Sequence, residues 1–118
     1  MSETPIMQRI RLALSRMGSR MFRNQVGTYQ LIDGRWLSSG LCTGSSDLIG
    51  WTPTMITADM VGRTVAVFTA VEVKAFRGRA RKEQNHFMDA VVNAGGIAGL
   101  ARSEADAVDI IRQRWLKA

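Results

Sequence analysis

Residues 64–74 read TVAVFTAVEVK, and this stretch decides the fold. Its β-branched and apolar residues predict a strand in the centre of a sheet, because such residues are enriched in strands. Glu72 and Lys74 interrupt the apolar run. Side chains alternate along a strand, so both emerge on one face while Val73 points into the opposite layer. A carboxylate beside an ammonium group at the end of such a strand costs desolvation free energy unless the two groups pair or bind a ligand.

A second short apolar strand, DLIGW at residues 47–51, precedes this stretch and begins with Asp47. It follows a loop rich in Gly and Ser over residues 38–46. Two carboxylates on neighbouring strands, together with the Val73 carbonyl, form an all-oxygen site suited to Mg²⁺ or Mn²⁺. Such an ion stabilises charge on a phosphodiester and makes a bound water more acidic. Lys74 would orient or activate that water, or stabilise the developing negative charge.

The segments around the two strands predict helices and a hairpin. Thr4 and Pro5 open a helix that ends near Gly18, and Asp33-Gly34 marks a hairpin turn between residues 28–32 and 35–37. A helix over about residues 82–94 and a strand over residues 97–101 follow, and Ser103 caps a last helix. The apolar stripes expected to pack are Ile6, Ile10, Ala13 and Met17 in the first helix, Phe87, Ala90, Val91 and Ala94 in the second, and Ala107, Ile110, Ile111 and Trp115 in the last.

In coarse order the chain reads α-β-β-β-α-β-α, which predicts an α/β fold with a mixed central β-sheet flanked by helices. A chain of 118 residues has the usual size of one domain, so residues 1–118 are expected to form a single domain. No apolar run approaches the length of a membrane span. The N-terminus lacks the features of a secretory signal, and the single cysteine, Cys42, cannot form an internal disulfide. These features predict a cytoplasmic protein.

The net charge of +6 favours an anionic partner, and two segments concentrate it. Residues 1–24 and residues 77–82 each carry a balance of +4. For either segment alone, solvated arginines are an equally good interpretation. Combined with an acidic metal site, however, the basic segments favour nucleic acid. The residues expected to contact it are Arg77, Arg79, Arg81, Lys82 and Arg23.

The motifs are similar to those of a known nuclease family. Ser46-Asp47 followed by Glu72-Val73-Lys74 resembles the PD-(D/E)xK signature. More narrowly, GSSDLIG (residues 44–50), VFTAVEVK (residues 67–74), Gln84 and IAGLARS (residues 97–103) resemble the VRR-NUC family. The resemblance extends over nearly the whole chain. It implies a restriction-endonuclease-like core, since single-domain members of this family resemble archaeal Holliday junction resolvases and act as homodimers on branched DNA.

The same resemblance implies roles for individual residues. Asp47, Glu72 and the Val73 carbonyl would be metal ligands, Lys74 would be catalytic, and Gln84 would help to position Lys74 or the water. Two departures stand out. Ser46 replaces the proline of the signature, which this family tolerates, and the acidic residue on the first helix of related resolvases can only correspond to Glu3.

The sequence therefore predicts a metal-dependent DNA endonuclease, structure-selective on Holliday junctions or flaps, in a bacterial or phage-infected host cell. Symmetric cutting of a junction needs two active sites, which a homodimer provides. Surplus apolar residues that would suit its interface are Leu41, Met55, Ile56 and Met60. Two alternatives remain open: a nuclease acting on single-stranded or sequence-specific DNA, and a non-catalytic nucleic-acid-binding module.

Overall fold

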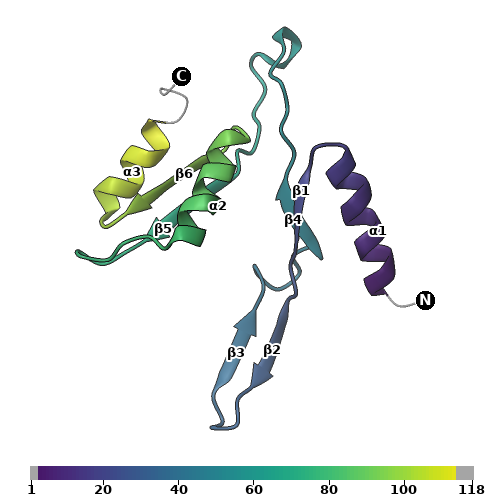
Figure 1. The fold of residues 1–118 in the computed structure, drawn as a ribbon, viewed down its shortest axis with the longest axis vertical. Coiled ribbons are helices and arrows are strands. Elements are labelled where there is room, and N and C mark those ends of the chain that lie inside the picture. The colour runs from purple at the N-terminus through teal and green to yellow at the C-terminus, as the bar shows by residue number, and fades with distance from the viewer. Residues whose placement is uncertain (1–2, 114–118) are drawn as a thin grey trace. The chain divides into compact units, whose positions relative to one another are not determined.

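The computed structural model describes residues 3–113, which fall into two compact units divided between Thr52 and Pro53 (Figure 1). The N-terminal unit contains α1 (Glu3–Arg16), β1 (Arg20–Arg23), β2 (Gly27–Gln30), β3 (Trp36–Ser39) and β4 (Leu48–Trp51). The C-terminal unit contains a 3₁₀ helix η1 (Ala58–Met60), β5 (Thr69–Val73), α2 (Lys82–Asn93), β6 (Ile97–Ala101) and α3 (Glu104–Arg112). The α/β class is confirmed. The expected order α-β-β-β-α-β-α has three strands between the first two helices, whereas the structure has five, β1 to β5.

In the N-terminal unit, α1 packs against the antiparallel pair β1–β4 (Figure 1). The helix begins at Glu3, so Pro5 lies in its first turn, where the missing N–H is tolerated. The expected stripe on Ile6, Ile10 and Met17 is wrong, because all three are exposed. Met7, Arg11 and Leu14 form the inward face instead. These positions share the same helical spacing, and the guanidinium of Arg11 donates from Nη2 to the Met21 carbonyl at 3.3 Å.

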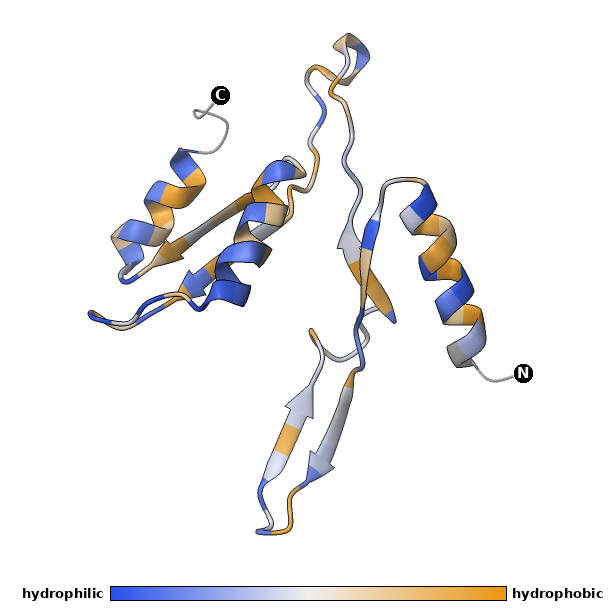
Figure 2. Ribbon diagram, in the orientation of Figure 1, coloured by the Kyte–Doolittle hydropathy of each residue, from blue (hydrophilic) through white to orange (hydrophobic). Residues whose placement is uncertain are grey.

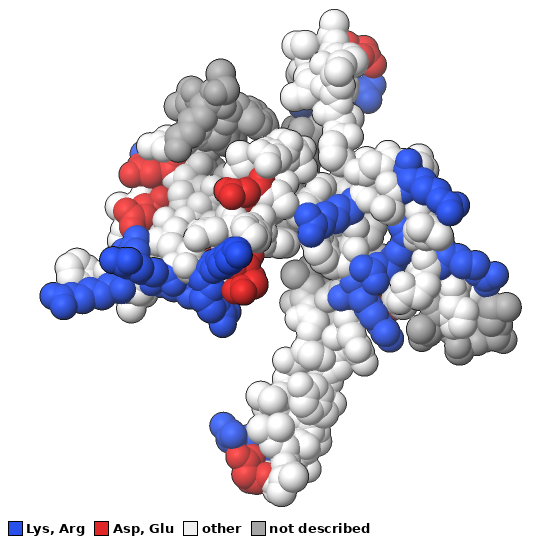
Figure 3. All heavy atoms as spheres, viewed as in Figure 1, with Lys and Arg blue, Asp and Glu red and all other residues white. Residues whose placement is uncertain are grey.

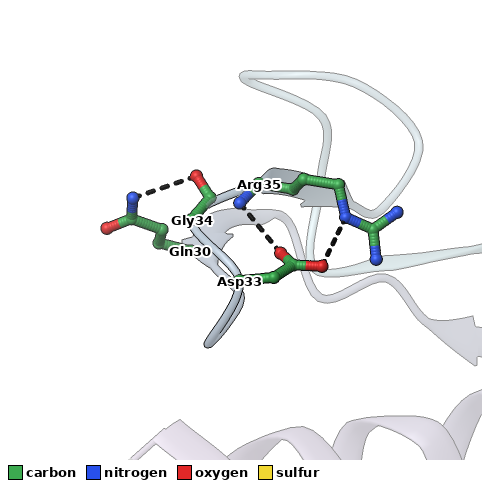
Figure 4. Close-up of polar contacts among 4 residues, drawn as sticks. All are labelled: Gln30, Asp33, Gly34 and Arg35. Carbon is green, nitrogen blue, oxygen red and sulfur yellow. Dashed lines mark hydrogen bonds and ion pairs between the residues drawn. The ribbon is translucent and has the colours of Figure 1, made fainter.

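The hairpin β2–β3 turns at the Asp33-Gly34 position that the sequence predicts. Leu31 N donates to the Arg35 carbonyl at 2.7 Å, and Gly34 has φ 91°, a conformation that favours glycine. Asp33 accepts hydrogen bonds from the backbone and the guanidinium of Arg35, while Gln30 donates to the Gly34 carbonyl (Figure 4). The Arg35 and Asp33 side chains are 73% and 53% exposed, so this ion pair contributes only about 0–1 kcal/mol.

In the C-terminal unit, the parallel pair β5–β6 packs against α2 and α3. Its buried side chains are Val91 from α2 and Ile97 and Ala101 from β6. β6 is hydrophobic along its length, and α3 turns hydrophobic residues toward it (Figure 2). Gly99 permits this approach, since a Cβ there would lie 2.8 Å from Ile110.

Several boundaries differ from those expected. The strand predicted over residues 64–74 is shorter in the structure, where only β5 forms. Its partner β6 spans only five residues, and the first amide of β6, Ile97 N, donates to the Phe68 carbonyl at 2.9 Å. The pairing therefore begins just before Thr69. The described strands pair two by two, as β1–β4, β2–β3 and β5–β6. Ser103 caps α3 as predicted, accepting from Asp106 N at 3.1 Å. Trp115 lies outside the described residues, as does the side chain of Glu3.

Candidate active site

Glu72 lies in β5 and Lys74 directly follows the strand, and the two side chains lie on one face, as strand alternation predicts. Their side chains are half-buried together with Ala70, whereas Val71 and Val73 are exposed on the other face. Glu72 pairs with Leu100 in the parallel ladder, and Lys74 N donates to the Ala101 carbonyl at 3.1 Å. The ladder therefore fixes the backbone under both functional groups.

The two side chains form an ion pair, with Lys74 Nζ 3.4 Å from Glu72 Oε1. The lysine side chain is 22% exposed and the glutamate 27%. At this exposure the charges are partly shielded from solvent, so they interact more strongly than a surface pair and still remain accessible to a ligand. A carboxylate and an ammonium held side by side in this way can act on one phosphate group.

Gln84 connects α2 to this pair. Its Nε2 donates to Glu72 Oε1 at 2.8 Å, and its Oε1 accepts from Arg81 N at 2.8 Å, just before the helix begins. One side chain thus satisfies an amide at the helix N-terminus and orients the glutamate. The resemblance implied that Gln84 positions Lys74 or a water, whereas the contact observed is with Glu72, the residue that pairs with Lys74.

A hollow of about 350 Å³ lies between β5 and α2, and Glu72 is one of the residues that line it. Its walls are Ala70, Val71, Glu72, Glu83, Gln84, Phe87 and Met88. Both contacts of the carboxylate within residues 3–113 use Oε1, so Oε2 is the oxygen available to a ligand. A carboxylate oxygen and peptide carbonyls are the donors that Mg²⁺ takes, and this ion usually completes its shell with waters and substrate phosphates.

The basic loop over residues 77–82 follows soon after Lys74 in the sequence. Arg77, Arg79 and Arg81 are exposed, whereas the alternating Gly78 and Ala80 are half-buried. Arg102, just after β6, donates from Nη2 to the Gly78 carbonyl at 2.7 Å. Lys and Arg side chains gather at the end of the C-terminal unit where this loop lies (Figure 3). The sequence did not single out Arg102, because its partner is a distant backbone carbonyl.

Asp47 and Arg23 belong to the N-terminal unit. Both are exposed, and Asp47 immediately precedes β4. Arg23 is the last residue of β1 and lies opposite Leu48 in the ladder. The Asp47 carbonyl accepts from Asn24 N at 2.8 Å. The structure thus brings Glu72, Lys74 and Gln84 together in one unit and describes Asp47 within the other.

The described part of the chain also contains other residue types that often bind metals or act as nucleophiles. Among residues 3–113, no group of three or more His, Cys, Asp and Glu side chains is placed to hold a metal ion. His86 is exposed on α2, two residues from Gln84, a spacing that places the two on different sides of a helix. Cys42 is a free, exposed thiol. In the described part of the chain, no helix has the length and apolar character to cross a membrane.

Comparison with known proteins places these residues in a family. The family model of the VRR-NUC domain matches residues 31–105, from the hairpin β2–β3 to the first turn of α3. The matched region includes Asp47, Glu72, Lys74 and Gln84. No curated protein and no solved structure matches the chain.

Proposed function

Because the chain belongs to the VRR-NUC family, we propose that it is a divalent-metal-dependent endonuclease that hydrolyses DNA phosphodiester bonds. The family is of the nuclease type and is generally metal-dependent, so DNA is the substrate that it implies. The observation that carries the proposal for this chain is the half-buried Glu72–Lys74 pair, which Gln84 holds on one face of β5. The proposed catalytic residues are Asp47, Glu72, Lys74 and Gln84.

The proposed metal ligands are the carboxylates of Asp47 and Glu72 and the carbonyl of Val73. When bound, Mg²⁺ or Mn²⁺ neutralises charge at the phosphate and makes a water more acidic. Gln84 keeps the Glu72 carboxylate in one orientation by donating to Oε1. That contact leaves Oε2 for the ion. Because the carboxylate already has one orientation before the ion binds, less conformational entropy is lost on binding.

Lys74 supplies a positive charge beside the scissile phosphate. Its ammonium group has three donors and is held near Glu72 Oε1 without being buried. In the transition state, negative charge grows on the phosphate oxygens, and a fixed ammonium stabilises it or orients the attacking water. Removing one such fixed donor typically slows catalysis by about 10²–10³-fold.

The basic loop is the proposed DNA-binding surface. The loop follows Lys74 in the sequence, and its basic side chains are all exposed: Arg77, Arg79, Arg81 and Lys82. Arg23, at the end of β1, provides a further contact. Phosphate contacts of this kind position the duplex without reading its sequence. Since the family match spans both units, we also propose that residues 1–118 form one nuclease domain.

Branched DNA such as four-way junctions or flaps is the proposed preference, with a homodimer as the active form. Two active sites related by a twofold axis permit paired cuts in a junction. Each unit exposes large apolar side chains that suit an interface, Leu41 in one and Met55 and Ile56 in the other. Monomeric soluble proteins rarely expose contiguous apolar patches of large area.

The proposal is tested by incubating a labelled four-way junction, a flap, a single strand and a plain duplex with Mg²⁺ or Mn²⁺. We expect metal-dependent cleavage, strongest on the branched substrates. Lys74→Ala, Asp47→Asn and Glu72→Gln should each lose at least about 10²-fold in rate. Asp89→Asn, which removes an exposed carboxylate from α2, should cut at the wild-type rate.

Three other outcomes decide among the alternatives. Salt-dependent DNA binding without cleavage in either metal would replace the nuclease with a non-catalytic binding module. Preferred cleavage of the single strand, or of one duplex sequence, would remove the branch preference and keep the nuclease. Full activity of Lys74→Ala and Glu72→Gln would place the active site elsewhere in the chain.

A further inference from the structure

Asn24 follows β1 directly, and its side chain bridges both ends of the loop that leads to Asp47. Its Oδ1 accepts from Leu41 N at 2.8 Å, at the start of the loop. Its Nδ2 donates to Ser45 Oγ at 2.7 Å and to the Ser46 carbonyl at 2.9 Å, at the end of the loop. Its backbone N donates to the Asp47 carbonyl at 2.8 Å. The amide side chain thus uses its acceptor and both of its donor hydrogens on one segment.

The loop is folded tightly onto this side chain. Ser45 Oγ donates to the Cys42 carbonyl at 2.6 Å, which closes a small turn within the loop. At the start of the loop, Gly40 has φ 86°, and a Cβ there would lie 2.7 Å from the Val26 Cα. The backbone at Gly40 therefore presses against the chain that follows Asn24.

The loop before Asp47 is rich in glycine and small polar residues, so few other interactions can order it. Glycine has the largest backbone freedom of any residue, and small polar residues bury little apolar surface. Leu41 and Cys42 are both exposed, so the loop is not held by packing of its larger side chains. Asn24 is half-buried, whereas Asp47 is exposed. The Asn24 side chain with its hydrogen bonds, called the clamp below, therefore lies on the buried side of the loop and can order it.

We propose that Asn24 is a positioning residue that holds the 41–47 loop, and with it Asp47, in the conformation that binds the metal ion. The proposal rests on the proposed function, in which Asp47 is a metal ligand. Without the clamp, binding must order the loop, so the ion binds more weakly. Residues that orient a ligand through hydrogen bonds typically change metal affinity by about 10- to 100-fold when they are substituted.

Three variants test the clamp. Asn24→Leu keeps the branched arrangement of four side-chain heavy atoms and cannot form the hydrogen bonds. Asn24→Asp retains the acceptor for Leu41 N and loses the donors to Ser45 and Ser46. Gln25→Ala changes the exposed neighbouring side chain and is the matched control. All are compared as full-length proteins.

The first readout is amide hydrogen exchange in the metal-free protein, which is independent of activity. Asn24→Leu should lose protection at Leu41 and across residues 42–47, while Asn24→Asp should keep protection at Leu41 alone. The second readout is Mn²⁺ affinity, by paramagnetic resonance or calorimetry. We expect affinity to fall about 10- to 100-fold in Asn24→Leu and to stay unchanged in Gln25→Ala.

The third readout is cleavage as a function of Mg²⁺ concentration. The Mg²⁺ concentration for half-maximal rate should rise in Asn24→Leu, with a maximal rate close to that of the wild type. Wild-type Mn²⁺ affinity in both Asn24 variants would overturn the inference, as would a low maximal rate that no Mg²⁺ concentration restores. Should the wild-type protein neither bind Mn²⁺ nor cleave DNA, the proposed function fails instead, and the exchange data still show whether Asn24 holds the loop.

Discussion

In the C-terminal unit, Glu72 lies on β5 and Lys74 directly follows it, and this strand is fixed by a parallel ladder and covered by α2. In the N-terminal unit, Asp47 ends a Gly- and Ser-rich loop that side-chain hydrogen bonds from Asn24 hold. The first arrangement relies on backbone pairing and burial, and the second on one amide group. A strand tolerates most changes on its exposed face, whereas the loop depends on the chemistry of a single residue.

Both units also use a side-chain amide to order the region that carries a candidate metal ligand. Gln84 links Glu72 to the N-terminus of α2 through two hydrogen bonds. The Asn24 side chain makes the corresponding link for the loop before Asp47, through Leu41 N, Ser45 Oγ and the Ser46 carbonyl. In each unit a carboxamide stands behind a candidate carboxylate, although one acts on the side chain and the other on the backbone of the loop. A carboxamide suits both tasks because it donates and accepts without carrying charge.

The largest effects are expected from two glycines, one in each unit. A Cβ at Gly50 would lie 1.8 Å from the Arg20 carbonyl oxygen, and one at Gly96 would lie 2.7 Å from Val91 Cγ1. Gly50→Ala should lower the free energy of unfolding by at least about 3 kcal/mol, and Gly96→Ala by about 1–3 kcal/mol. Urea denaturation followed by circular dichroism measures both.

Gly27→Ala is the control for this pair, because its Cβ would meet only Ser39 Oγ, at 3.8 Å. It should leave stability unchanged or raise it by less than about 1 kcal/mol. If the two units form one domain, each damaging variant shifts a single transition. Separate transitions, each sensitive to one glycine, would show that the units fold independently. An unchanged Gly50→Ala protein would contradict the β1–β4 register.

The next largest effect concerns the support of Glu72. Gln84→Leu should reduce metal affinity and cleavage by about 10- to 100-fold, because the orienting donor is lost. It should also lower stability by about 0.5–1.5 kcal/mol, since Arg81 N loses its acceptor. Metal titration, cleavage assays and thermal unfolding measure these quantities.

Gln84→Glu separates the two roles of this residue. It keeps an acceptor for Arg81 N but loses the donor to Glu72, so cleavage should fall while helix stability changes less. Asn85→Ala alters the exposed neighbouring side chain and should affect neither property. Cleavage by Gln84→Leu at the wild-type rate would mean that the hydrogen bond to Glu72 has no part in catalysis.

The smallest effects are expected at the DNA-binding surface. Arg79→Ala and Arg23→Ala should each weaken binding to all sequences and reduce the slope of log affinity against log salt by about 1. Arg112→Ala removes the same charge from α3 and should leave the slope unchanged. Fluorescence anisotropy between 50 and 200 mM salt, about the range where such contacts matter, measures the slopes. A slope that changes for Arg79→Ala alone would restrict the DNA surface to the C-terminal unit.

Much of the C-terminal unit could be predicted because its signals are local. Alternation places Glu72 and Lys74 on one face, Gly95 and Gly96 end α2, and Ser103 caps α3. The buried face of α1 was predicted wrongly, because the local pattern there fits more than one face. Apolar residues lie on several of its sides, so spacing alone does not choose the face on Met7 over the one on Ile6 and Ile10.

The side-chain contacts of Asn24 and Arg102, and that of Gln84 with Glu72, could not be predicted, because each joins residues that are distant in sequence. The partners of Asn24 are largely backbone atoms, which every residue carries, and the same is true of Arg102 with Gly78. No residue pattern marks such a partner. Gln84 could be assigned to the site through the family motif, but its bond to Glu72 required the structure.

The bond between Leu41 N and Asn24 Oδ1 also has a consequence for chain length. It brings the two ends of the intervening segment together, so the hairpin β2–β3 departs from and returns to nearly one point. Segments with adjacent ends and exposed tips are where insertions are best tolerated. The turn at Gly34 is therefore a suitable place to splice in a peptide tag or a fluorophore attachment site, or to shorten the hairpin, while the Asp47 loop keeps its conformation.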